Sequence, residues 1–495
     1  MIDCKNVSFS YPGSAQGALK NISVSIADGS FVLLCGGSGC GKTTLSRLFN
    51  GLIPHYHEGT LTGAVYVNGW DTRETSLFEL SLAVGSVFQN PRAQFFNVDT
   101  TSELAFGPEN HGLPEDVVRG RVAQVARDLH LTPLLERSIF SLSGGEKQRL
   151  ACGSAAATEP EIFVLDEPSS NLDADATRDL RALLAMLKAQ GKTVIVSEHR
   201  LYYLAGLFDR VLYMRDGEIA GDYTAAEFCQ LSDAEREGMG LRPLDLASLA
   251  EVTAPPALAT GEAWRIEKFS FAYKGEAPIL DIHDATFPDG AATAIIGHNG
   301  AGKSTLARCL CGLEKRARGE LVHAGARDGR KARLKGCYMV MQDVNHQLFC
   351  ESVMEEILLS MAVPDAAQAQ EILAAMDLAE VAEAHPMGLS GGQKQRVAVA
   401  SALVSERSLV LFDEPTSGLD LLHMRQVAQL INHLTASGRT ALVVTHDPEF
   451  ILRACQHVLH LEKGRITESY SLATGADRAR LLAFFERETK EASNL

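Results

Sequence analysis

The chain has 495 residues, of which 46% are hydrophobic and 22% are charged. These proportions are typical of a soluble globular protein, and the length favours roughly two to four domains over a single core. Acidic residues outnumber basic ones by 62 to 46, and the resulting net charge of −16 disfavours nucleic acid as a partner.

The sequence shows no pattern of a secretion signal or a membrane span. The first residues lack a charged stretch followed by a long apolar one, and apolar runs such as residues 31–35 are far too short to cross a bilayer. The ten cysteines do not have the paired spacing of a zinc site, so we expect them to be buried and reduced. The composition predicts a soluble protein that can still dock on a membrane partner.

The predicted secondary structure alternates strands and helices along the chain. Residues 31–35 form an apolar run that ends at a glycine-rich turn, and residues 43–52 follow as a helix. Residues 118–129 repeat apolar positions at helical spacing, whereas residues 162–165 and 409–412 are buried-type strands that end on carboxylates. This alternation is typical of an α/β fold with a mostly parallel sheet.

The pattern of the first half of the chain returns in the second half. The segment GGSGCGKT at residues 36–43 corresponds to GHNGAGKS at 297–304, and LSGGEKQR at 142–149 corresponds to LSGGQKQR at 389–396. In both copies 23 residues separate the serine of the second segment from an aspartate, and 33 more separate that aspartate from a histidine. The equal spacing indicates that the chain contains two copies of the same fold.

The repeat divides the chain into a first domain at residues 1–245, a linker at 246–263 and a second domain at 264–495. The linker contains two adjacent prolines and lacks helical or strand periodicity, which favours a surface segment. Because both domains belong to one chain, each is present at a high effective concentration near the other. The two domains can therefore associate without a second copy of the chain.

Each copy contains a strand, a Gly-x4-Gly-Lys-Thr/Ser segment and a helix, which together predict a phosphate-binding loop. Its glycines let successive backbone N–H groups point at phosphates near a helix N-terminus. Lys42 and Lys303 are expected to contact the β- and γ-phosphates of ATP, and Thr43 and Ser304 to bind Mg²⁺. The other expected phosphate contacts are Gly36, Gly39, Gly41, Thr44, Gly297, Gly300, Gly302 and Thr305.

Two adjacent acidic residues end the later strand of each copy. Asp166 and Asp413 occupy the position from which a carboxylate can hold the metal opposite the phosphate loop. The following residues, Glu167 and Glu414, are placed to polarise a water that attacks the γ-phosphate. The sequence therefore predicts ATP hydrolysis in both copies.

The segment LSGG(E/Q)KQR, lying between the phosphate loop and the Asp-Glu strand, resembles the signature of the ABC ATPases. The resemblance extends over nearly the whole chain. It implies two tandem P-loop NTPase domains of the ABC type, each with a parallel-sheet core and a helical subdomain. It also implies that each ATP lies between the P-loop of one copy and the signature of the other, where the expected contacts are Ser143, Gly145, Ser390 and Gly392.

The same resemblance implies roles for four further pairs of residues. Tyr11 and Tyr273 are expected to stack on adenine, and Gln89 and Gln342 to sense the metal. His199 and His446 are expected to contact the γ-phosphate, and Asp173 and Asp420 to couple the two sites. Both copies keep every catalytic residue type. Glu146 departs from the glutamine usual in the signature, which leaves open whether the two sites turn over equally.

The segments after Gln89 and Gln342 resemble the ATPases of energy-coupling factor (ECF) importers. Residues 89–96 read QNPRAQFF, residues 105–110 read AFGPEN, and residues 342–349 read QDVNHQLF. This resemblance implies an integral membrane scaffold and a small substrate-binding membrane protein as partners. Candidate scaffold contacts are Phe95, Phe96, Leu348 and Phe349, with packing in the core as the alternative.

We therefore expect the energising ATPase of an importer for a vitamin or metal ion, peripheral to the cytoplasmic face of the cell membrane. One alternative is the tandem ATPase of a carbohydrate or nucleoside importer, whose second site is commonly degenerate. Another is an ABC protein acting on ribosomes or DNA, which the acidic charge and the short linker disfavour. Residues 481–485 (LLAFF) are expected to pack on their own domain, and His55, His57 and Glu58 to lie in a surface loop rather than to bind a metal.

Overall fold

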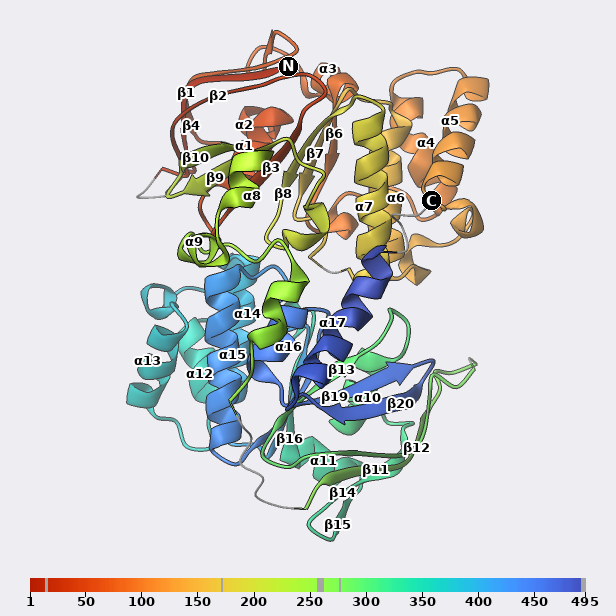
Figure 1. Ribbon diagram of the computed structural model, residues 1–495, viewed down its shortest axis with the longest axis vertical. Helices are drawn as coiled ribbons and strands as arrows, with labels where there is room; N and C mark the ends of the chain where they lie inside the picture. The colour runs from red at the N-terminus through yellow and green to blue at the C-terminus, as the bar shows by residue number, and fades with distance from the viewer. Residues whose placement is uncertain (14–16, 171, 256–261, 276, 491–495) are drawn as a thin grey trace. The chain divides into compact units, whose positions relative to one another are not determined.

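The computed structural model describes residues 1–13, 17–170, 172–255, 262–275 and 277–490 (Figure 1). It divides into two units, of which unit 1 comprises Met1–Asp245 and unit 2 comprises Leu246–Arg487. The larger sheet of unit 1 has the strand order β10-β9-β3-β8-β7-β6. Neighbouring strands from β9 to β6 are parallel, and β10 pairs antiparallel with β9. The bounds are β3 Phe31–Gly36, β6 Val84–Val87, β7 Ile162–Asp166, β8 Thr193–Ser197, β9 Arg210–Arg215 and β10 Glu218–Thr224.

The parallel strands are apolar throughout because both faces of the sheet are covered. Val32 and Leu34 of β3 join a core with an antiparallel sheet and α1, whereas Phe31 and Leu33 face a second core built with helices. The antiparallel sheet has the order β2-β1-β4-β5. Its strands are β1 Ile2–Ser10, β2 Leu19–Ile26, β4 Thr60–Val67 and β5 Trp70–Asp71.

The helical part of unit 1 follows β6 in the chain. The predicted helix at 118–129 is confirmed as α5, whose buried face carries Val118, Val122 and Val125. The helix predicted at 43–52 is shorter than expected, because Gly51 adopts a φ of +74° and separates α1 from α2. The bounds are α1 Lys42–Phe49, α2 Leu52–His55, α3 Leu77–Ala83, α4 Thr100–Asn110, α5 Glu115–Asp128, α6 Gly144–Ala157, α7 Ala174–Ala189, α8 Ala225–Gln230 and α9 Asp233–Gly238.

Unit 2 repeats this architecture. Its larger sheet has the order β16-β17-β18-β13-β19-β20 and its antiparallel sheet the order β12-β11-β14-β15, so each position of unit 1 has a counterpart. The strands are β11 Trp264–Phe271, β12 Leu280–Phe287, β13 Ala292–Ile296, β14 Arg318–His323, β15 Ala326–Asp328, β16 Cys337–Val340, β17 Leu409–Asp413, β18 Thr440–Val444, β19 His457–Glu462 and β20 Arg465–Ser471. The helices are α10 Lys303–Leu310, α11 Arg330–Gly336, α12 Val353–Ser360, α13 Ala366–Ala375, α14 Gly391–Val404, α15 Leu421–Ala436, α16 Pro448–Ala454 and α17 Gly475–Lys490. The predicted fold class, two α/β P-loop domains each with helices beside a parallel sheet, is confirmed.

The segment predicted as a linker begins with structure of its own. Residues Leu246–Glu251 form a 3-10 helix in which Leu246 and Leu249 are buried, while residues 256–261 lie outside the described part of the chain. The C-terminal helix α17 packs on unit 2 as expected, since Arg480 pairs with Glu468 at 2.8 Å and Phe485 is buried. Among the described residues, no helix is both long and apolar enough to cross a membrane.

The turn that joins β3 to α1, and its counterpart between β13 and α10, depends on glycine. Gly36 and Gly297 both have a φ of +145°, and a Cβ on Gly297 would lie 2.0 Å from the Leu461 carbonyl oxygen. Gly300 also has a positive φ, +81°, but a Cβ there would meet nothing within 4 Å. Glycine is therefore required at position 297 because a side chain would collide with the neighbouring strand β19. At position 300 it is favoured only by its backbone conformation.

This contrast predicts different effects of two alanine substitutions. Gly297→Ala should displace the loop from β19 and reduce ATP binding at unit 2 at least tenfold, because the Cβ collides with main-chain atoms that cannot move aside. Gly300→Ala, the matched control, should cost only about 1 kcal/mol of backbone strain. Nucleotide titration of both variants checks the difference, and equal effects would contradict it.

Candidate nucleotide sites

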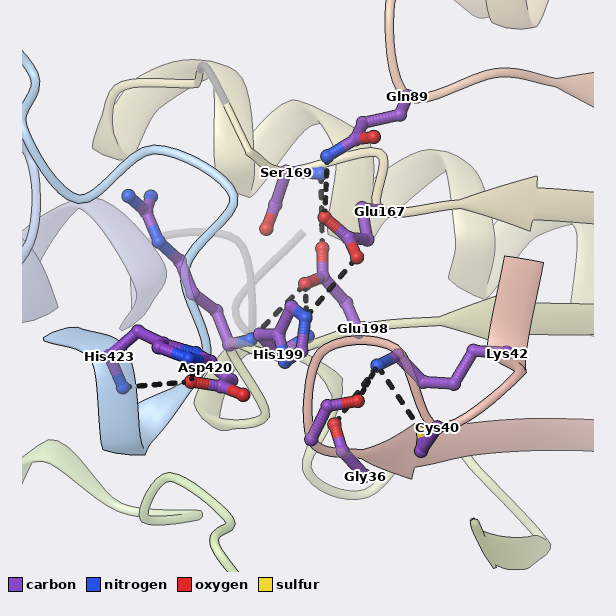
Figure 2. Close-up of polar contacts among 12 residues, drawn as sticks. Gly36, Cys40, Lys42, Gln89, Glu167, Ser169, Glu198, His199, Asp420 and His423 are labelled. Carbon is purple, nitrogen blue, oxygen red and sulfur yellow. Dashed lines mark hydrogen bonds and ion pairs between the residues drawn. The ribbon is translucent and has the colours of Figure 1, made fainter. Parts of the chain in front are cut away.

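The lysine of each phosphate loop folds back over the loop that carries it. Lys42 donates from Nζ to the carbonyl oxygens of Gly36 at 3.0 Å and Gly37 at 2.9 Å (Figure 2). Lys303 makes the same contacts with Gly297 at 2.7 Å and His298 at 2.9 Å. Both ammonium groups are thus held at the loop that leads into a helix N-terminus, where backbone N–H groups favour an anion.

The aspartates that end β7 and β17 lie beside the hydroxyl groups that begin α1 and α10. Ser304 donates to Asp413 Oδ1 at 3.0 Å. Burial, reinforced by the neighbouring charge of Glu167, raises the pKa of Asp166, and the Thr43 hydroxyl partly opposes this shift. Asp166 Oδ1 is buried without a hydrogen-bond partner among the described residues. A hydroxyl and a buried, unsatisfied carboxylate oxygen form an oxygen donor set that suits Mg²⁺.

The glutamates that follow these aspartates have an unusual backbone conformation. Glu167 has a φ of +44° and Glu414 a φ of +51°, which is rare for a residue other than glycine. This turn points the Glu167 carboxylate at two other predicted site residues: Gln89 donates to it at 2.7 Å, and His199 Nε2 lies 3.2 Å from it (Figure 2). Strained backbone that holds a carboxylate among polar partners is characteristic of functional sites.

Unit 2 reproduces the central part of this arrangement. His446 Nε2 lies 3.5 Å from Glu414 Oε1, and the Glu414 backbone N–H donates to the Val444 carbonyl oxygen, just as that of Glu167 donates to Ser197. Gln342 follows β16 and is exposed. The glutamate–histidine pair is therefore common to both units.

Glu198 is a buried site residue that the sequence reasoning missed. Its carboxylate accepts hydrogen bonds from the backbone N–H groups of Ser169, His199 and Arg200 and from the Tyr203 hydroxyl, at 2.7 to 3.1 Å. It thereby ties the histidine loop to the loop after β7 (Figure 2). Thr445 occupies this position in unit 2. A comparison of the two copies would therefore have shown that the residues differ, but not that Glu198 accepts these hydrogen bonds.

The serine of each signature segment caps a long helix. Ser143 begins α6 and Ser390 begins α14, each through a reciprocal pair of hydrogen bonds with the third helical residue. The Ser143 N–H donates to Glu146 at 2.7 Å, and the Ser390 N–H donates to Gln393 at 2.9 Å. Glutamate and glutamine can both fill this role, so the departure at Glu146 preserves the cap and changes only the charge.

The remaining predicted site residues have structural contacts of their own. Tyr11 and Tyr273 accept hydrogen bonds from Arg47 and Arg308 at 2.9 and 3.2 Å. Asp173 and Asp420 cap the helices α7 and α15. Thr44 lies 3.3 Å from the Tyr11 hydroxyl. Neither tyrosine ring is fully buried, so both remain available for stacking.

The four candidate scaffold contacts fall into two groups. Phe96 and Phe349 are each 75% exposed, whereas Leu348 is buried and Phe95 packs against the core. For Leu348 the structure favours the alternative, packing in the core, because its side chain is buried. His55 was expected in a surface loop, but it is the last residue of α2, and its Nε2 lies 2.7 Å from the Thr72 carbonyl oxygen.

These features define a chain with two P-loop ATPase units. A model of the family described as "ABC transporter" matches residues 19–170 and 280–417, and a model described as an AAA domain also matches residues 384–452. A putative ABC transporter ATP-binding protein of Treponema denticola is 46% identical over 94% of this chain and 96% of its own length. One of Methanosarcina mazei is 33% identical over 94% of this chain and 88% of its own. The chain belongs to the ABC transporter family, and it is an ATP-binding ATPase with two fused ABC repeats.

Solved structures show the same fold along the whole chain. A chain in "Model of ribosome-bound archaeal Pelota and ABCE1" aligns with a TM-score of 0.69, 24% identity, and coverage of 97% of this chain and 80% of its own. A chain of the archaeal aP1–aABCE1 complex aligns with a TM-score of 0.64 and 24% identity over 98% of this chain and 92% of its own. At this identity the likeness concerns the fold alone.

The burial of the Asp166 carboxylate predicts that its replacement raises the stability of the folded state and lowers ATP hydrolysis. Because burial raises its pKa, ionised Asp166 destabilises the folded state increasingly as pH rises above the usual carboxyl range. At pH 7, without Mg²⁺ or nucleotide, Asp166→Asn should therefore raise the free energy of unfolding by about 1 kcal/mol. The same variant should lose most of the hydrolysis at unit 1.

Denaturant unfolding across pH and an ATPase assay check this pair of effects. Glu74→Gln, at an exposed turn, is the control and should change neither quantity. Lower stability of Asp166→Asn at pH 7 would show that the carboxylate is stabilised by its surroundings, contrary to the burial argument.

Proposed function

We propose that this chain is the energising ATPase of an importer of the ECF kind, which takes up a micronutrient such as a vitamin or a metal ion. The observation that carries the proposal is an exposed apolar patch in each unit, and the two patches share two equivalent pairs of positions, Phe96 with Phe349 and Phe140 with Met387. In unit 1 the patch consists of Phe96, Val98 and Phe140, which are 75, 67 and 79% exposed. In unit 2 it consists of Phe349, Leu359 and Met387, which are 75, 61 and 53% exposed.

Large exposed aromatic and aliphatic side chains that cluster are characteristic of a binding surface for another protein. The unit 1 patch is held together by local contacts, since the Phe96 ring stacks on Phe106 with centroids 5.0 Å apart. The Ile139 N–H also donates to the Val98 carbonyl oxygen at 2.9 Å, which brings Phe140 beside the same segment. A partner helix with an apolar face fits such a surface.

The patches have different compositions, which supports two different partner segments. Phe140 of unit 1 corresponds to Met387 of unit 2, and Val98 corresponds to the charged Glu351, so the unit 1 patch has two aromatic residues and the unit 2 patch has one. A single membrane scaffold that presents two unlike cytoplasmic helices matches this asymmetry better than two identical subunits do. The proposal adds a small substrate-binding membrane protein, which selects the cargo, and places the chain at the cytoplasmic face of the membrane.

The proposed chemistry assigns the same roles in both units. Lys42 and Lys303 neutralise the β- and γ-phosphates. Thr43 with Asp166, and Ser304 with Asp413, would hold Mg²⁺, which supplies charge neutralisation between those phosphates. Glu167 and Glu414 orient and deprotonate the attacking water. His199 and His446 hold these carboxylates in place and contact the γ-phosphate, and Gln89 and Gln342 sense the metal.

The signature segments complete the proposal. Ser143 with Gly145, and Ser390 with Gly392, lie at helix N-termini, where backbone N–H groups favour an anion. Each would contact the γ-phosphate bound by the other unit, with Tyr11 and Tyr273 against the adenine. Hydrolysis then removes the shared phosphate and releases the units, and the two patches pass that change to the scaffold.

Two other functions are less well supported. A carbohydrate or nucleoside importer commonly has a degenerate second site, but Lys303, Glu414 and His446 are all present. Action on ribosomes rests only on a likeness of fold to chains at 24% identity.

The double variant Phe96→Ser/Phe349→Ser tests the docking proposal. It should reduce co-purification of a polytopic membrane protein from native membranes at least tenfold, because it removes the central aromatic residue of each patch. ATP binding should be unchanged, since neither residue contacts a phosphate loop. Quantitative mass spectrometry of affinity-purified complexes makes the measurement.

Tyr56→Ser is the matched control, since Tyr56 is 73% exposed and lies outside both patches. It should leave recovery at the native level. Full recovery of the membrane protein with the double variant would contradict the docking proposal. Recovery of ribosomes, or of a permease together with a soluble binding protein, would favour one of the alternatives.

A further inference from the structure

Unit 1 contains a cavity of about 200 Å³ between α6 and α7, which run side by side (Figure 1). The α6 wall includes Gln148, Arg149 and Cys152, and the α7 wall includes Asp179 and Leu183. Its volume greatly exceeds the roughly 15 Å³ that one water requires and is below the ~300 Å³ of drug-sized sites. The cavity therefore suits a metabolite much smaller than a nucleotide.

The cavity wall includes a buried amide donor without a hydrogen-bond partner among the described residues. Gln148 is only 4% exposed, and its Nε2 makes no hydrogen bond within the described part of the chain. The equivalent residue of unit 2, Gln395, donates from Nε2 to the Glu414 carbonyl oxygen at 3.3 Å. A buried amide donor without an acceptor costs free energy, so a ligand that supplies an acceptor would be favoured at this position.

The same cavity carries charges of both signs beside an apolar wall. Arg149 lies 3.3 Å from Asp179, and Asp128 accepts a hydrogen bond from Gln124 at 2.7 Å. Arg149 and Gln148 offer hydrogen-bond donors, whereas Asp179 and Asp128 offer acceptors. The remaining wall is largely aliphatic.

Unit 2 has a polar bridge where unit 1 has this opening. Gln426 donates to Asp377 at 2.7 Å and so links α15 to the turn after α13. The equivalent residues of unit 1 are Asp179 and His130, and both line the cavity. In addition, Ala176 of the cavity wall corresponds to the larger His423 of unit 2. These substitutions distinguish the wall of the unit 1 cavity from the equivalent region of unit 2.

We propose that this cavity binds a small zwitterion with an apolar side chain, of the amino-acid class. The carboxylate accepts hydrogen bonds from Gln148 and Arg149, the ammonium group is held by Asp179 and Asp128, and the side chain packs on Leu183 and its aliphatic neighbours. Each group of the ligand is thereby matched to a group of the wall, as a specific polar site in a mostly apolar pocket requires.

The position of the cavity links the ligand to ATP hydrolysis. Gly145 lines it from the first turn of α6, next to the Ser143 cap, and Leu172 lines it one residue before Asp173, the cap of α7. A bound ligand bridges these two helix starts. It therefore acts on the signature segment without contacting nucleotide, and the cavity is a regulatory site.

Equilibrium dialysis of the full chain against radiolabelled L-leucine tests the proposal. One leucine should bind per chain, and 4-methylpentanoate or 3-methylbutylamine, which each keep one of the two charges, should compete at least tenfold less well. Saturating leucine should change the ATPase rate at least twofold. No saturable binding at millimolar leucine, equal competition by either analogue, or an unchanged ATPase rate would overturn the proposal.

The double variant His130→Asp/Asp179→Gln transfers the unit 2 bridge into unit 1. It should weaken leucine binding at least tenfold and abolish the effect of leucine on the ATPase rate, while the basal rate stays at the native level. The reverse exchange in unit 2, Asp377→His/Gln426→Asp, is the matched control. It leaves the larger His423 at the position of Ala176, so the chain should keep one bound leucine.

Leucine binding that survives His130→Asp/Asp179→Gln with a normal basal rate would place the ligand elsewhere and overturn the assignment. If that variant loses its basal rate, Leu183→Phe, which only fills the cavity, provides the second test and should give the same loss of leucine binding. Undiminished binding to Leu183→Phe would be equally contradictory.

Discussion

Parallel pairing of three adjacent strands is the constraint on which both sites depend. In unit 1, β3 pairs with β8 and β8 pairs with β7, all in the same direction. Their carboxyl ends therefore meet at one edge of the sheet, where β3 leads into the phosphate loop, β7 into Asp166 and Glu167, and β8 into the histidine loop. Residues that are more than 100 positions apart in the sequence come within hydrogen-bond distance only because this pairing is in register. The order β17-β18-β13 gives the same result in unit 2.

Because the chain contains an internal repeat, each residue of one unit can be compared with the equivalent residue of the other. Features that recur, such as the positive φ of Glu167 and Glu414 and the capped starts of α6 and α14, lie in segments whose local sequence also recurs. Residues that differ between the units include Glu198, part of each apolar patch, and His130, Ala176 and Asp179 in the wall of the unit 1 cavity. The two units thus share their chemistry and differ in what they can contact.

Much of the fold and the core of each site could be predicted from the sequence. The P-loop pattern, the Asp-Glu strands and the equal spacing to His199 and His446 were sufficient, because they are local patterns with strong physical requirements. Helix lengths were less predictable, since Gly51 ends α1 early through a backbone conformation that periodicity does not record. The sequence did not distinguish docking from core packing for Leu348, because a run of apolar residues does not show which side chains face solvent.

Other features could not be read from the sequence at all. Glu198 belongs to the site through four hydrogen bonds to groups on two loops, and no motif marks such a residue. The wall of the cavity beside α6 differs from unit 2 at His130 and Asp179. Their counterparts, Asp377 and Gln426, form a hydrogen bond between α15 and the turn after α13, and only the structure shows that contact. Both features come from contacts between distant segments.

The central claim is that one chain carries two competent ATP sites, and the number of nucleotides bound per chain tests it most directly. In the variant Glu167→Gln/Glu414→Gln, equilibrium titration with Mg²⁺ and ATP should give two ATP bound per chain with turnover nearly abolished. One ATP per chain, or substantial remaining hydrolysis, would contradict the account.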